Sequence, residues 1–98
     1  MKYSNTGTEN NTVSISCFGS VENSNDFRFL EEFLEEGHSV VLNMTEVDYI
    51  NSCGFGAMVE ETMNFSDSDC TLSITGLPPG IRKTLAVLGG EELLSYID

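Results

Sequence analysis

Residues 40–61, VVLNMTEVDYINSCGFGAMVEE, form the stretch that decides the fold. A continuous apolar run of strand length, SVVLNM at 39–44, predicts a β-strand that is buried on both faces. The polar pair Asn51 and Ser52 follows, and the pattern then becomes helical over residues 53–64. The side chains expected to face inward from this helix are Phe55, Met58, Val59, Thr62 and Met63. The pattern therefore predicts a buried strand that delivers a serine to the start of a helix.

The flanking segments alternate between strand and helix patterns. Residues 12–18 and 70–76 alternate with a period of two, which predicts half-buried strands. Residues 26–36 predict an amphipathic helix, LPPG opens a third helix, and residues 91–98 predict a last one. The inward side chains expected from these segments are Val13, Ile15, Cys17, Phe27, Leu30, Phe33, Leu34, Ile81, Leu85, Leu88, Leu93, Leu94 and Ile97. The residues expected to cap or stop these helices are Asn23, Ser24, Asn25, Gly37, Gly89 and Gly90. This order predicts an α/β fold with a small, mostly parallel (mixed) sheet and helices packed against it.

The length and composition fit one small domain over residues 1–98. The segment 1–11 is polar, and we expect a short edge strand around residues 2–4. Sixteen acids face four bases, which gives a net charge of −12. Such a chain repels nucleic acid and anionic membranes, since both are bound through clusters of Lys and Arg. The acidity fits solubility or salt adaptation, and it also fits steering toward a partner with a basic surface.

The sequence predicts a cytoplasmic protein. Its first ten residues have no apolar core and cannot act as a signal peptide, and no window approaches the roughly 18 apolar residues of a membrane span. Three cysteines without CxxC spacing predict reduced thiols, with neither a disulfide framework nor a zinc site.

Ser52 lacks the neighbours that a catalytic serine needs. The lone histidine, His38, lies near the opposite end of the strand, and SCGFG does not match the GxSxG elbow. GFG lacks the lysine of a phosphate-binding loop, and Cys53 is interpreted more simply as a small buried apolar residue than as a reactive thiol. We therefore expect no enzymatic activity. At the start of a helix Ser52 can serve as an N-cap, and free N–H groups there can also stabilise a phosphoryl group.

The chain resembles the STAS domain family, which includes bacterial anti-sigma factor antagonists and cytoplasmic domains of sulfate transporters. The family pattern is an apolar strand, a short polar turn, an apolar pair, Asp-Ser-Ser/Thr-Gly and a helix, and it reads here as VVLNMTEVDYINSCGFGAMV. GSVEN stands where the family has a Gly-Glu-Leu-Asp-like turn, with Gly19 and Glu22 at corresponding positions. LPPGIRKTLAVLGGEELLSYI resembles the closing helix, turn and last helix, so the similarity extends from Thr12 onward. Two residues depart from the family pattern: Asn51 replaces the usual Asp, and Cys53 replaces the usual Ser or Thr.

The resemblance implies a partner-switching role. In the antagonists, the serine at the Ser52 position is phosphorylated by a partner serine kinase, which is the anti-sigma factor itself. Phosphorylation breaks the complex between antagonist and anti-sigma factor, and a phosphatase restores it. The ATP site would belong to the partner, so no cofactor is expected here. The residues that the resemblance assigns to the docking face are Glu22, Tyr49, Asn51, Ser52, Cys53, Gly54, Phe55 and Gly56. The alternative is a constitutive STAS adaptor of a transporter or sensory complex, in which Ser52 is only a helix cap. The missing side chains of Gly54 and Gly56 fit either close approach of a partner or packing of the helix on its own sheet.

Overall fold

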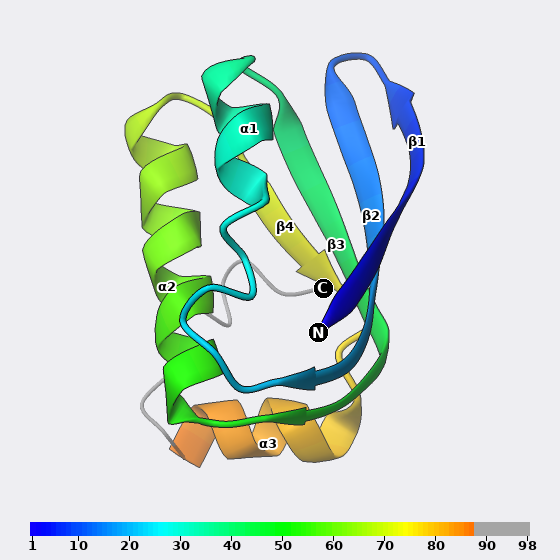
Figure 1. The fold of residues 1–98 in the computed structure, drawn as a ribbon, viewed down its shortest axis with the longest axis vertical. Helices are drawn as coiled ribbons and strands as arrows, with labels where there is room; N and C mark the ends of the chain where they lie inside the picture. Colours follow the sequence, from blue (N-terminus) through cyan, green and yellow to red (C-terminus); the bar gives the residue numbers. More distant parts are fainter. Residues whose placement is uncertain (88–98) are drawn as a thin grey trace.

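Four strands form one mixed sheet in the computed structural model, which describes residues 1–87 (Figure 1). The strands are β1 (Lys2–Glu9), β2 (Thr12–Val21), β3 (Ser39–Ile50) and β4 (Leu72–Thr75), and they lie side by side in that order. β1 is antiparallel to β2, whereas the β2–β3 and β3–β4 pairs are parallel. The helices are α1 (Leu30–Glu35), α2 (Ser52–Asp67) and α3 (Pro79–Val87). The predicted α/β fold with a mixed, mainly parallel sheet is confirmed.

The core lies on one face of the sheet. Val13, Ile15 and Cys17 of β2 are buried, as their alternation predicts. On β3 every second residue of the apolar run is buried, but Val41 is only half-buried and Asn43 is exposed. The prediction of a strand buried on both faces is therefore wrong. The reason is that the apolar side chains of α1 and α2 join a single core cluster with the alternate residues of β2 and β3.

The polar segment at the start of the chain forms a longer strand than predicted. β1 has eight residues rather than three, and all of them are exposed. It turns into β2 through Asn10 and Asn11, whose φ angles are 50° and 64°. Positive φ at both positions of a two-residue connection matches the twist of a β-hairpin, and Asn tolerates that conformation well.

The first helix is shorter than the predicted segment 26–36, because it begins only at Leu30. The carboxylate of Asp26 accepts hydrogen bonds from the backbone N–H groups of Glu22 (3.0 Å) and Asn23 (3.1 Å) and thereby holds the preceding residues in turns. None of the predicted capping side chains caps the helix. Gly37 has a φ of 76°, which fits its predicted place just past the helix end.

The second helix is longer than predicted and its buried stripe is displaced. Met58 and Thr62 are buried as expected, but Met63 is 60% exposed. Glu61 and Phe65 take the inward positions instead. The helix thus buries a carboxylate that the sequence pattern assigns to water.

The third helix crosses the end of the sheet and contacts β3 (Figure 1). Ile81 and Leu85 are buried, as predicted. Leu88, the two glycines after it and the terminal helix predicted at 91–98 lie outside the described residues. None of the helices in the described part of the chain combines the length and apolar character required to cross a bilayer.

Candidate functional site

Asn51 joins three segments at the point where β3 ends. Its backbone is extended (φ −97°, ψ −178°), and its side-chain Oδ1 accepts a hydrogen bond from the N–H of Gly54 at 2.9 Å. Its Nδ2 donates to the carbonyl of Glu22 at 3.1 Å, and its backbone N–H donates to the carbonyl of Val21 at 3.1 Å. Asn51 therefore caps α2 and also fastens the helix start to the end of β2.

Ser52 is the first residue of α2 and is exposed. The interpretation of Ser52 as the helix cap is wrong, because Asn51 stands one residue earlier, outside the helix, and supplies the capping oxygen. The Ser52 hydroxyl makes no hydrogen bond within the described residues, and its side chain is not needed to hold the turn. Ser52 instead presents an accessible hydroxyl beside the unpaired N–H groups of the first helical turn.

The two glycines of the turn have different surroundings. A Cβ atom at Gly54 would lie 2.6 Å from Cγ1 of Val21 and closer still to the Val21 carbonyl oxygen. A Cβ atom at Gly56 would have no neighbour within 4 Å. Gly54 is therefore needed for packing of α2 on β2, whereas Gly56 leaves open surface beside Ser52. Phe55 is half-buried and packs against the core.

The remaining residues assigned to the docking face lie at the surface around Ser52. Glu22 and Cys53 are exposed, and Tyr49 is 51% exposed. Glu22 is brought to the turn by the hydrogen bond from Asn51, although 29 positions separate them in the sequence. The structure thus brings together residues from the end of β2, the end of β3 and the start of α2.

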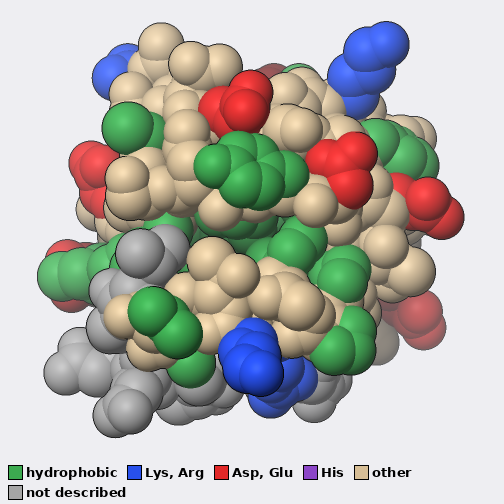
Figure 2. Space-filling model, turned by 90° about the horizontal axis from the view of Figure 1, so that it is seen from below, with side chains coloured by type: hydrophobic (Ala, Val, Ile, Leu, Met, Phe, Trp, Pro, Cys, Tyr) green, Lys and Arg blue, Asp and Glu red, His purple; other side chains and the backbone are tan. Residues whose placement is uncertain are grey.

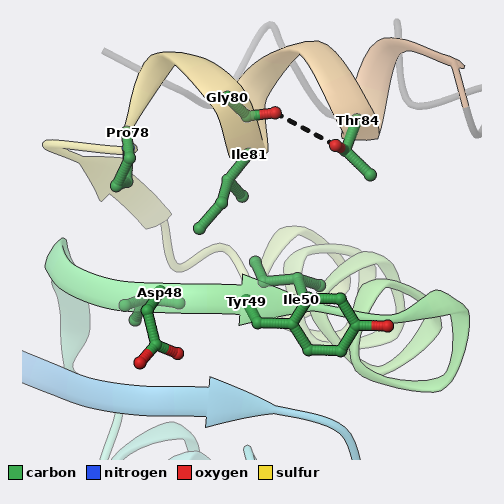
Figure 3. Close-up of a pocket in the computed structure, with 8 residues that line it drawn as sticks. Asp48, Tyr49, Ile50, Pro78, Gly80, Ile81 and Thr84 are labelled. Atoms are coloured by element: carbon green, nitrogen blue, oxygen red, sulfur yellow. Dashed lines mark hydrogen bonds between the residues drawn. The ribbon is translucent and has the colours of Figure 1, made fainter.

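A groove adjoins this face, between the end of β3 and α3. Its volume is about 310 Å³, and its apolar lining comes from Val47, Ile50, Pro78 and Ile81. In Figure 3, Pro78 and Ile81 point toward β3, whereas the carboxylate of Asp48 points to the other side of the strand. Only Asn51 stands between Ile50 and Ser52 in the sequence, so the groove and the helix start form neighbouring surfaces.

A second hollow of about 320 Å³ continues along α3. It is lined by Gly80, Lys83, Thr84 and Val87, and it shares Gly80 and Thr84 with the first groove. Figure 2 shows this end of the molecule, with hydrophobic side chains in a hollow between an acidic border and a border carrying Lys and Arg. Sequence reasoning missed the groove, because its two walls come from segments about 30 residues apart and no motif links them.

The cysteines differ in accessibility. Burial raises the pKa of the Cys17 thiol to about 12, so this thiol stays protonated and unreactive. Cys53 is exposed in the first turn of α2, so its interpretation as a small buried apolar residue is wrong. Across residues 1–87, no three or more His, Cys, Asp or Glu side chains come together in a group that could hold a metal ion.

The model of the STAS domain family matches residues 17–96, which is most of the chain. The chain belongs to the STAS domain family. Among solved structures, the fold is similar to that of the anti-sigma factor antagonist SpoIIAA in its unphosphorylated form. The TM-score is 0.69 at 16% sequence identity, and the match covers 87% of this chain and 82% of SpoIIAA. No curated protein sequence gave a match.

Proposed function

We propose that this STAS domain is an anti-sigma factor antagonist that binds a serine-kinase anti-sigma factor and is switched off by phosphorylation of Ser52. A phosphatase would reverse the switch, and the cycle would run in the cytoplasm to regulate transcription. The chain itself would perform no catalysis, because in this scheme the kinase supplies the ATP site. Membership of the STAS family and the likeness to SpoIIAA support the general role.

The observation that carries the proposal is that Asn51, and not Ser52, caps α2. Asn51 makes the hydrogen bonds that hold the turn, whereas Ser52 is exposed and its hydroxyl bonds to no other described residue. A phosphoryl group on Ser52 would lie at the N-terminus of a 16-residue helix, where free N–H groups and the helix dipole favour an anion. The modified domain would therefore stay folded while its surface changes by about −1.5 to −2 charges.

The docking face in this proposal extends from Ser52 into the neighbouring groove. Tyr49, which is 51% exposed, and the open surface at Gly56 belong to this face, and the adjoining groove is lined by Val47, Ile50 and Ile81, whose side chains are themselves largely buried. Exposed aromatic residues beside an apolar hollow are typical of the centre of protein interfaces. A dianion at the edge of such a contact would have to lose water without a matching cation, which weakens binding.

The proposal is tested with four baits in a lysate of the native host: wild type, Ser52→Ala, Ser52→Glu and Ser66→Glu. Ser66 is an exposed serine near the other end of α2, so Ser66→Glu adds the same charge to the same helix far from the face. We expect a serine-kinase partner on every bait except Ser52→Glu. Mass spectrometry after incubation of the wild-type complex with ATP should locate phosphate on Ser52.

The opposite result is equally clear. A common prey on all four baits, with Ser52 unmodified after incubation with ATP, would contradict the switch and identify the domain as a constitutive adaptor. Loss of the partner from Ser66→Glu as well would show that added charge anywhere on α2 is disruptive, and the assignment to Ser52 would fail.

A further inference from the structure

Glu61 is a buried carboxylate that the proposed docking face does not use. It lies on the inward side of α2, where its side chain is only 6% exposed. Its Oε2 has almost no contact with solvent and no hydrogen-bond partner. An ionised carboxylate in this setting loses its hydration without replacement, which is costly, whereas the neutral acid is tolerated much better.

The charges around Glu61 come from two sides. Glu31 of α1 and the neighbouring Glu60 of α2 oppose its ionisation, while Arg28, in the turn before α1, favours it. The core faces of β3 and β4, against which α2 also packs, present apolar side chains such as Leu42, Leu72 and Ile74. Burial first, and then Glu31 and Glu60, raise the pKa of Glu61 from its ordinary value of 4.5 to about 6.

α1 has little helical stability of its own. It is a six-residue helix with no side-chain hydrogen bond at its N-terminus, and the residues leading into it form turns. Helices this short depend on packing for their stability. α1 and α2 cover the same face of the sheet in Figure 1, and Glu31 of α1 and Arg28 before it act electrostatically on Glu61. An unfavourable negative charge on Glu61 should therefore destabilise α1 before the other elements.

We propose that Glu61 acts as a proton-operated latch for α1: the helix stays packed while the buried carboxyl of Glu61 is neutral, and ionisation of that carboxyl loosens it. This inference does not depend on the proposed antagonist function. The inference rests on a buried oxygen without a hydrogen-bond partner, on the carboxylates of Glu31 and Glu60 that oppose ionisation, and on a short helix without a side-chain cap.

The direction of the pH effect follows from the affinity of Glu61 for a proton in the folded form and in the open form. In the folded form Glu61 holds its proton more tightly than in an open form that exposes it to water. The stabilisation by the proton is complete below about pH 4.5 and is lost as the pH rises through about 6. The difference between the two values corresponds to a change of up to about 30-fold in the equilibrium for opening.

Amide hydrogen exchange of the intact chain tests the latch. The N–H groups of Glu36 and His38 donate to carbonyls of α1 at 3.3 Å and 3.0 Å, and they report on its opening. We expect the protection factors of these two amides, corrected for the intrinsic effect of pH on exchange, to fall between pH 4.5 and pH 7. The decrease should be several-fold and at most about 30-fold. Glu61→Gln should remove this dependence and keep the high protection at pH 7.

Two further variants make the result specific. Glu60→Gln should retain the transition with its midpoint at lower pH, whereas Arg28→Gln should move the midpoint to higher pH, because each removes a charge with a known effect on Glu61. The latch is overturned if Glu61→Gln shows the wild-type pH dependence. It is also overturned if amides of β2 and β3 lose protection in parallel with those of α1, because the effect would then be global.

Discussion

Adding one methyl group should have opposite effects at the two glycines of the Ser52 turn. Gly54 is buried against Val21, and a Cβ atom there would lie 2.6 Å from Val21 Cγ1 and 2.8 Å from the Val21 carbonyl carbon. Gly56 lies two residues further along the same helix, and an added methyl group there would have nothing within 4 Å. Gly56→Ala is therefore a matched control for Gly54→Ala.

The expected magnitudes come from two opposing terms. Replacing Gly by Ala inside a helix contributes about 1 kcal/mol of stability when the site has room. At Gly54, forcing a methyl group against backbone costs roughly 1–3 kcal/mol. The Val21 carbonyl also accepts the N–H of Asn51 at 3.1 Å, so its displacement weakens a hydrogen bond worth about 1 kcal/mol. We expect Gly54→Ala to destabilise by about 1–3 kcal/mol and Gly56→Ala to stabilise by up to about 1 kcal/mol.

Urea unfolding followed by far-UV circular dichroism measures both variants against wild type. The result that supports the structure is a difference of about 1–4 kcal/mol between them, with unchanged dependence on urea concentration. Equal midpoints for the two variants, or a Gly54→Ala protein more stable than wild type, would refute the close packing of α2 on β2.

Three smaller predictions concern the same turn and the cysteines. Asn51→Ala should lower the free energy of unfolding by about 1–2 kcal/mol. Asn51→Asp should lower it less, because Asp keeps the cap and loses only the hydrogen bond to the Glu22 carbonyl; the urea midpoints of both variants check this order. Ser52→Ala should change the unfolding free energy by less than about 0.5 kcal/mol, and a cost near that of a lost cap would contradict the assignment of the cap to Asn51. A thiol reagent at neutral pH should modify Cys53 in the folded protein and reach Cys17 only on unfolding; peptide mapping distinguishes them, and early labelling of Cys17 would contradict its burial.

The strands were predictable wherever the alternation of side chains was regular. β2 shows this, because its inward residues Val13, Ile15 and Cys17 follow a strict period of two. β3 runs to Ile50, six residues beyond the predicted strand at 39–44, through a stretch that resembles a polar turn. Exposed residues such as Thr45 and Glu46 in the second half of this strand obscure the pattern, and the register with β2 shifts twice along it. Local periodicity cannot reveal an extension that depends on pairing with a neighbouring strand.

The place of Ser52 at the start of a helix was predictable, but the contacts around it were not. The strand-to-helix motif predicted this place because the motif is contiguous in the sequence. The cap was misassigned by one residue, since Asn and Ser are both good caps and only the backbone geometry of Asn51 distinguishes them. The bond from Asn51 to Glu22 spans 29 positions, and it gives a local reason for Asn at a position where the family resemblance leads one to expect Asp: a carboxylate could not donate this hydrogen bond.

The acidity of the chain constrains how phosphorylation of Ser52 could act. The net charge is −12, so a phosphoryl group would change it to only about −14, and long-range attraction of a basic partner would persist. We therefore expect the loss of binding to arise at the contact itself, from the cost of removing water from an anion beside Gly56 and the groove. Such a local cost is insensitive to salt, whereas long-range effects between exposed charges are screened within about 10 Å at 0.1 M salt. The affinity ratio of wild type to Ser52→Glu for the partner, measured by calorimetry, should thus stay constant between low salt and about 0.5 M salt, even as both affinities fall. A ratio that collapses toward one as salt is added would show that the switch acts through the overall field of the protein, and the close contact proposed around Ser52 would have to be abandoned.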